Sequence, residues 1–82
     1  MIVQFVEPEW DEEIDDLNYD NYNICVARTV KDYDRFFKFI KQLKNHMVVI
    51  NKEWYTVLDY ALDISWESEK EPLLKVFITK LY

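Results

Sequence analysis

Carboxylates dominate the side chains in this sequence that could do chemistry, and the first site they suggest is one for calcium. Asp16, Asn18 and Asp20 match positions 1, 3 and 5 of a calcium-binding loop. That loop needs glycine at position 6 and a bidentate glutamate at position 12, where this chain has Asn21 and Ala27. A zinc site takes three or four ligands, and one Cys and one His cannot supply them. We therefore expect no metal site and no cofactor.

Groups for nucleophilic catalysis are equally sparse. Cys25 is the one thiol and His46 the one imidazole, so a catalytic pair would exist only if the fold brought them together. Cys25 stands between Ile24 and Val26, which is typical of a small core residue. The chain has no glycine, and this excludes phosphate-binding loops and nucleophile elbows that depend on it. The sequence predicts a protein that is not an enzyme.

Aromatic and basic residues occur together around Phe36, Phe37 and Phe39, a combination that can bind nucleic acid by stacking. Phe36 and Phe37 fall on the apolar stripe of a predicted helix, so only Phe39 and the neighbouring lysines remain for such a surface. The net charge of −6 also repels a phosphate backbone. We expect no direct binding to nucleic acid.

The distribution of charge is more informative than its sum. Residues 1–24 carry eight acids and no Lys or Arg, whereas residues 25–82 carry eight acids and all 10 bases. The first segment therefore has a charge of −8 and the rest of the chain +2. If the acidic segment is helical, at about 1.5 Å per residue, its charges are spaced about 2.5 Å apart, close to the ~1.7 Å of duplex DNA.

This pattern predicts a small acidic inhibitor or regulator that occupies the basic surface of a host nucleic-acid-binding protein or nuclease by imitating nucleic-acid charge. The abundance of residues with AT-rich codons suggests a phage or plasmid origin. The alternative is a non-catalytic assembly module, a homodimer, whose acidic helix only provides solubility. The predicted partner-binding residues are Glu9, Trp10, Asp11, Glu12, Glu13, Asp15, Asp16 and Asp20.

No run of the sequence approaches the ~18 apolar residues of a membrane span, and the first residues lack the basic flank of a signal peptide. A single cysteine fits a reducing compartment. We expect a cytoplasmic protein that does not bind membranes and is a monomer or a homodimer.

The acidic segment is predicted to begin with a strand and continue as a helix. Residues 2–7 form a short apolar run that is typical of a strand. Pro8 can open a helix, and Trp10, Ile14 and Leu17 then follow at the spacing of one helical face. We expect an amphipathic acidic helix packed against the rest of the protein.

The next segment is predicted to contain a turn, a strand and a second helix. Residues 18–23 are rich in Asn and Asp, which replace glycine in turns, and residues 22–29 form a strand. Thr29 and Asp32 form a loose capping box for a helix over residues 30–45. The apolar stripe of this helix comprises Tyr33, Phe36, Phe37, Ile40 and Leu43.

Residues 46–50 are typical of a buried strand, and Asn51 and Lys52 of a tight turn. Residues 53–66 are compatible with a helix or a strand, but the alternation of apolar and polar residues favours a strand. The side chains predicted to face inward are Trp54, Leu58, Tyr60, Leu62, Ile64 and Trp66.

Residues 68–72 form a polar connection, and residues 73–82 a final strand. The predicted order is β-α-β-α-β-β-β. This predicts a single α+β domain over residues 1–82, with a mainly antiparallel sheet of about five strands covered by two helices.

Overall fold

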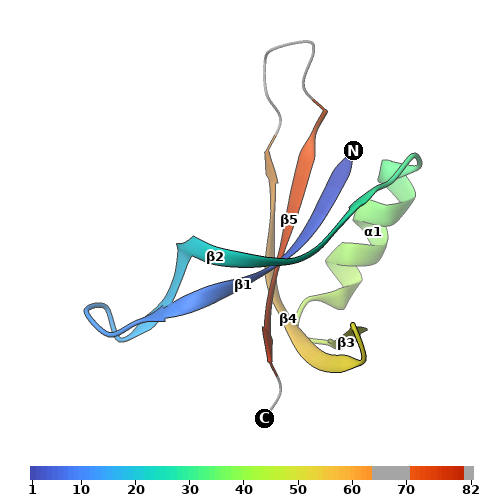
Figure 1. The fold of residues 1–82 in the computed structure, drawn as a ribbon. Coiled ribbons are helices and arrows are strands. Elements are labelled where there is room, and N and C mark those ends of the chain that lie inside the picture. The colour runs from blue at the N-terminus through green and yellow to red at the C-terminus, as the bar shows by residue number, and fades with distance from the viewer. Residues whose placement is uncertain (64–70, 81–82) are drawn as a thin grey trace.

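The computed structural model describes residues 1–63 and 71–80 and contains one sheet and one helix (Figure 1). The strands are joined in the order β2-β1-β5-β4-β3. Strands β1 and β5 are parallel and the other neighbours antiparallel, so five strands are confirmed, but the sheet is mixed. The elements are β1 (Ile2–Asp11), β2 (Asp16–Thr29), α1 (Tyr33–Leu43), β3 (Met47–Ile50), β4 (Glu53–Asp63) and β5 (Leu73–Lys80).

The helix predicted for the acidic segment is wrong, because β1 continues through Pro8 to Asp11 and returns as β2. Trp10 and Leu17, seven residues apart, face each other across the two strands, while Ile14 lies in the turn. A spacing of seven fits one face of a helix and also fits two partners in a hairpin. Pro8 is tolerated here because the ladder is irregular between Pro8 and Glu9.

The turn predicted over residues 18–23 is also wrong, because these residues belong to β2. They do contain the largest irregularity of the sheet: Pro8 pairs with Tyr22 and the next residue, Glu9, pairs with Asn18. Residues 19–21 therefore have no partner on β1 and bulge from the ladder. The bulge brings the ring of Tyr19 to 4.9 Å from Phe77 of β5 in an edge-to-face contact, which stabilises the base of the hairpin.

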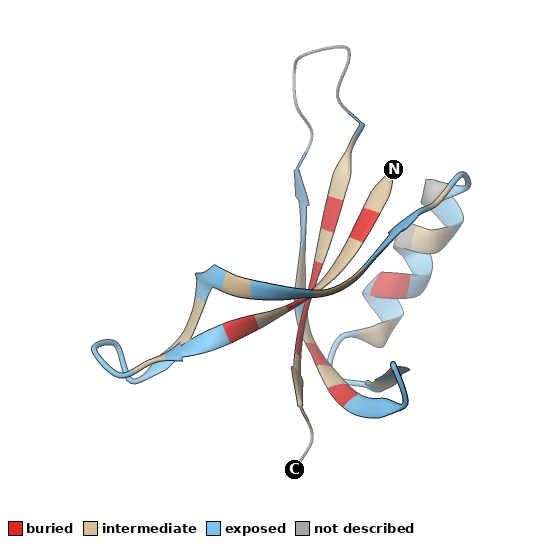
Figure 2. Ribbon diagram, viewed as in Figure 1, coloured by how far each residue is buried: buried red, intermediate tan, exposed pale blue. Residues whose placement is uncertain are grey.

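The core lies between one face of the sheet and the helix, and its buried positions belong mainly to the central strands (Figure 2). Strand β5 is flanked on both sides by other strands and contributes buried residues to both faces of the sheet. Cys25 packs against this core, as predicted. The buried cluster consists of Val3, Ile40, Tyr55, Val57, Leu74, Val76 and Ile78.

The helix predicted over residues 30–45 is confirmed as α1. It is capped by Asp32, whose carboxylate accepts a hydrogen bond from the backbone N–H of Arg35 at 3.3 Å. The predicted capping box that begins at Thr29 is therefore wrong, since the strand before the helix extends to Thr29. Ile40 is fully buried and fixes the helix on the sheet, whereas Phe36 and Leu43 are only partly covered.

The strand prediction for residues 53–66 is confirmed as far as Asp63, but the predicted inward face is wrong at Trp54 and at Leu62, both of which are exposed. Tyr55 and Val57 are buried and Trp54 is exposed. A register shift between Val57 and Asp59 reverses the alternation, so that Tyr60 packs against the core as predicted. Ile64, Trp66 and residues 68–70 of the predicted connection lie outside the described residues, as do residues 81–82 of the last strand.

Strand β3 is less buried than its apolar sequence predicts. Its side chains alternate, with Met47 and Val49 exposed and Val48 and Ile50 packed against the core. This alternation arises because one face of β3 packs against the core and the other faces solvent.

The tight turn predicted at Asn51 and Lys52 joins β3 to β4, and both residues adopt left-handed backbone conformations, with φ of 52° and 68°. This two-residue type of hairpin turn favours Asn followed by Gly. In the described part of the chain, Asp15 and Asn45 also adopt positive φ. Asn and Asp thus do replace glycine, though not at residues 18–23.

Replacing Lys52 with Gly is expected to stabilise the protein by about 0.5–1 kcal/mol, because the left-handed conformation is strained for Lys. Urea denaturation measures the change. The control is Asn51→Gly, which should have a smaller effect because Asn tolerates this conformation. A lower midpoint for Lys52→Gly than for the unmodified protein would contradict the turn geometry.

No helix among the described residues is long and apolar enough to cross a membrane.

Candidate functional site

The predicted partner-binding residues lie on a hairpin that extends beyond the sheet. Pairing between β1 and β5 ends at Val6 and Phe77, whereas pairing between β1 and β2 continues to Asp11 and Asp16. We call residues 7–20 the acidic hairpin, and Figure 1 shows it extending away from the helix and the other strands. Its eight acids are therefore held at one end of the molecule.

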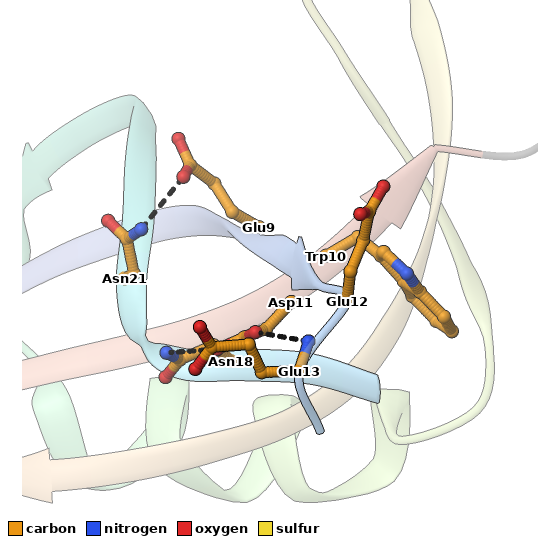
Figure 3. A pocket seen from close by; sticks show the side chains of 7 residues that line it. All are labelled: Glu9, Trp10, Asp11, Glu12, Glu13, Asn18 and Asn21. Carbon is orange, nitrogen blue, oxygen red and sulfur yellow. Dashed lines mark hydrogen bonds between the residues drawn. The ribbon is translucent and has the colours of Figure 1, made fainter. Parts of the chain in front are cut away.

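The hairpin brings the predicted residues together, although by strand pairing instead of a helix. Glu9 and Asp11 lie on β1, while Asp16 pairs with Asp11 from the beginning of β2. Glu12, Glu13 and Asp15 lie in the turn between the strands, and Asp20 lies in the bulge of β2. A cavity of about 370 Å³ at the tip is lined by Glu9, Trp10, Asp11, Glu12, Glu13, Asn18 and Asn21 (Figure 3).

Asparagine side chains orient one carboxylate of β1. Glu9 accepts hydrogen bonds from the amide of Asn21 at 2.8 Å and from that of Asn23 at 3.3 Å, one on each oxygen. This arrangement fixes the side chain without neutralising its charge. Glu9 is therefore available to a cation while its position is set by the bulged part of β2.

Asp11 is held in a similar way, as Figure 3 shows. One oxygen accepts from the backbone N–H of Glu13 at 2.9 Å, which fixes the start of the turn, and the other accepts from the amide of Asn18 at 3.4 Å. Sequence reasoning assigned these asparagines to a turn and missed this role. The signal that could have found it is a cluster of amide donors opposite glutamate and aspartate in a hairpin.

The acids of the hairpin form no ion pair in the described part of the chain, although the charge of Glu7, at its base, acts on Lys80. Elsewhere, the structure pairs Lys80 with Glu53 at 3.1 Å and Lys44 with Asp59 at 3.8 Å. Within residues 1–63 and 71–80, no carboxylate of the acidic hairpin forms such an ion pair. Beyond Glu7, the negative field of the hairpin is therefore not offset by an ion pair within these residues.

Large apolar side chains are exposed among these acids, and those of Trp10 and Ile14 are the most exposed of them. Trp10 is 59% exposed and Ile14, in the turn, is 58% exposed. The indole of Trp10 points away from the asparagines in Figure 3. Exposed tryptophan surrounded by charge is typical of an interface anchor. Ile14 was not among the predicted partner-binding residues, because the expected helix placed it on a buried face.

The groups that could bind a metal ion or act as a nucleophile can be compared with their positions in the structure. Among the described residues, no group of three Asp, Glu, His or Cys side chains is placed to hold a metal ion. The pKa of the Cys25 thiol is raised, mainly by burial and also by the nearby charge of Glu7, which disfavours the nucleophilic thiolate. No protein-family model, curated protein or solved structure matches the chain.

An ion pair between the neighbouring strands β4 and β5, formed by Glu53 and Lys80, makes stability depend on pH. Hydrogen bonds from Lys80 and from the Tyr55 hydroxyl, the latter at 3.1 Å, lower the pKa of Glu53. Bonding to Glu53 raises the pKa of Lys80 in turn. The stabilisation that Glu53 provides is complete above its unfolded-state pKa of about 4.3 and is lost as the pH falls through its lower folded-state pKa.

Stability measured by urea denaturation is therefore expected to fall less steeply below about pH 4.3 in a Glu53→Gln variant than in the unmodified protein. The control is Glu71→Gln, which removes a carboxylate that is exposed and lies 3.9 Å from the amino group of Met1. Identical acid profiles for the unmodified protein and Glu53→Gln would show that this ion pair does not contribute.

Proposed function

We propose that this protein is a non-catalytic inhibitor or regulator that acts in the cytoplasm and binds a basic surface of a nucleic-acid-binding protein or nuclease through the acidic hairpin. The observation that carries the proposal is the set of carboxylates on a protruding hairpin that form no ion pair within residues 1–63 and 71–80. Carboxylates in this state gain most from a partner rich in Lys and Arg, because no existing ion pair must be broken.

The density of charge supports imitation of nucleic acid. From Glu7 to Asp11, β1 extends about 14 Å at ~3.4 Å per residue, and the returning strand lies about 4.8 Å away. Eight carboxylates on this length and its turn correspond to about one charge per 2 Å. Duplex DNA carries about one charge per 1.7 Å. The hairpin thus approaches the charge density of a duplex more closely than the predicted helix would.

The orientation of Glu9 and Asp11 supports the same proposal. Asparagine amides and a backbone N–H hold these carboxylates before any partner binds. Preorganised groups lose less conformational freedom on binding, so more of the electrostatic attraction appears as affinity. Trp10 adds an exposed apolar anchor beside them.

The proposal is tested by capture followed by displacement. The protein is immobilised, incubated with a lysate of a low-GC bacterium at about 50 mM salt, and washed with duplex DNA. We expect DNA to release the captured protein, which mass spectrometry should identify as a basic nucleic-acid-binding protein or nuclease. A captured protein that DNA does not displace, or one without a nucleic-acid site, would contradict imitation of nucleic acid.

The alternative function, a homodimeric assembly module, is favoured by a second observation. Val49 of the edge strand β3 pairs with Trp54 of β4, and both side chains are exposed. Met47 is exposed on the same strand. An edge strand with exposed apolar side chains can pair with another chain. Sedimentation separates the two functions: an apolar dimer persists in high salt and dissociates on dilution, whereas the inhibitor is a monomer in both.

A further inference from the structure

An open apolar groove lies between the helix and the two edges of the sheet, away from the acidic hairpin. Its main cavity has a volume of about 530 Å³. Phe5 of β1 and Val26 of β2 form one side, Phe36 and Leu43 of α1 another, and Val48 of β3 contributes to the wall. Volumes of 300–1,000 Å³ with mainly apolar walls are typical of sites for small molecules.

Among the side chains of α1 that the structure describes, that of Ile40 is the one fully buried, and the groove opens beside it. On either side of it along the helix, Phe36 and Leu43 are only partly covered, and Phe39 is 54% exposed at the opening. Phe5 and Val26 on the sheet are also only partly buried. These apolar surfaces face a common space that no described part of the chain fills.

Charge in the main cavity of the groove is of one sign. Arg28 is the one charged side chain among the described residues that line the main cavity. It lies opposite Val3 in the β1–β2 ladder and so on the face of the sheet that bears the core. No ion pair is formed by Arg28 within residues 1–63 and 71–80. The guanidinium is therefore available to an anion at the edge of an apolar space.

A second, adjoining cavity of about 320 Å³ lengthens the groove. It shares Phe36 and Phe39 with the first and contains Arg35, the other arginine of the chain. Asp32 also lines this part, but its carboxylate caps the helix by accepting the backbone N–H of Arg35. Both arginines of the protein thus lie along one continuous apolar groove.

We propose that this groove binds a free aliphatic carboxylic acid, with its chain against the phenylalanine and valine side chains and its carboxylate on Arg28. The planar guanidinium of Arg matches a carboxylate and can donate two parallel hydrogen bonds to it. An elongated apolar cavity fits a flexible chain, and Arg28 disfavours a cationic head group. The proposal goes beyond the proposed function, because the groove and the acidic hairpin share no residue.

The test is a titration with decanoate below its micelle concentration, followed by calorimetry and by amide resonances in NMR spectra. We expect saturable binding, with shifts for Val26, Arg28 and Val48 and none for the acidic hairpin. Decanol should bind at least tenfold more weakly, because it lacks the anion that Arg28 recognises, and decylammonium more weakly still.

Three variants connect the binding to the groove. Arg28→Gln should weaken decanoate binding about tenfold and leave decanol binding unchanged. Lys75→Gln, the matched control, removes a charge of the same sign from a lysine that lies over the ring of Tyr22, 5.1 Å from its centroid, and should bind decanoate normally. Val26→Phe should fill part of the cavity and abolish binding, while its NMR spectrum shows an intact fold.

Several results would overturn the proposal. Equal affinity for decanoate and decanol would show that the groove does not recognise the carboxylate. Unchanged decanoate binding by Arg28→Gln would show that Arg28 does not contribute to binding. Sedimentation with phosphatidylglycerol vesicles in the absence of decanoate binding would assign the groove to a membrane surface. A stable dimer whose interface shifts the same resonances would assign it to a second copy of the chain.

Discussion

Neutralising four acids at the tip of the hairpin is expected to weaken binding to the basic partner about a hundredfold at low ionic strength. The variant combines Glu12→Gln, Glu13→Gln, Asp15→Asn and Asp16→Asn. Each substitution keeps the size and shape of the side chain and removes one attraction to Lys or Arg, worth about 0.5–1 kcal/mol at an exposed interface. Most of the loss should be in the association rate, since long-range attraction steers the encounter.

The measurement is affinity at several salt concentrations, using the partner identified by displacement with DNA. For the variant, affinity should fall less steeply with salt than for the unmodified protein, because fewer charges remain to be screened. The control changes the net charge equally on the rest of the molecule, with Asp34→Asn, Asp59→Asn, Asp63→Asn and Glu71→Gln. If both quadruple variants lose affinity to the same extent, net charge and not the hairpin governs binding.

Replacing Ile40 with Ala should lower the free energy of unfolding by about 2–5 kcal/mol. Ile40 is a fully buried residue of α1 and belongs to the same core cluster as Val3, Val57 and Leu74. Its truncation leaves a cavity where the helix is held on the sheet. Since small domains are stable by only about 5–15 kcal/mol, much of the stability of this protein depends on one side chain.

Urea denaturation measures this loss, with Ile14→Ala as the matched control. The control removes the same atoms from a side chain that is 58% exposed in the hairpin turn, so its effect should stay within about 0.5 kcal/mol. Equal losses from the two substitutions would mean that the helix is not held by Ile40.

The helix α1 and the strand β5 could be predicted from the sequence because their signals are local. The recurrence of Phe36, Ile40 and Leu43 fits one helical face, and β5 is a short apolar run that the structure places between two other strands. For these two elements, the side chains that the apolar pattern predicts to be buried include those that the structure buries.

The hairpin could not be predicted because its signal is ambiguous. The spacing between Trp10 and Leu17 fits a helix, while Pro8 and the acids that follow it are typical of a helix start. The structure pairs these residues across two strands, and the irregularity opposite Pro8 removes the usual objection to proline in a strand. The residues of the candidate site could be predicted because the acids are concentrated in the first 24 residues. This concentration is visible in the sequence whether the segment forms a helix or a hairpin.

The remaining differences arise from contacts between residues far apart in the chain. The bulge at Leu58 shifts the register of β4 by one residue, so that Val57 is buried before it and Tyr60 packs against the core after it. The alternation of apolar and polar residues in the sequence does not show where such a bulge will form. The groove around Arg28 has no signal in the sequence, because it depends on where the helix sits on the sheet.

The parallel pairing of β1 with β5 divides assembly of the sheet into local and distant steps. The hairpin β1–β2 and the meander β3–β4–β5 each form between neighbouring segments, but they join only through contacts such as Val3 with Leu74. Closing so long a loop costs entropy before any of these contacts forms, and such topologies fold slowly. The transition state for folding is therefore expected to contain the pairing of β1 with β5. Contacts such as that of Val3 with Leu74 then determine the folding rate of the protein as well as its stability.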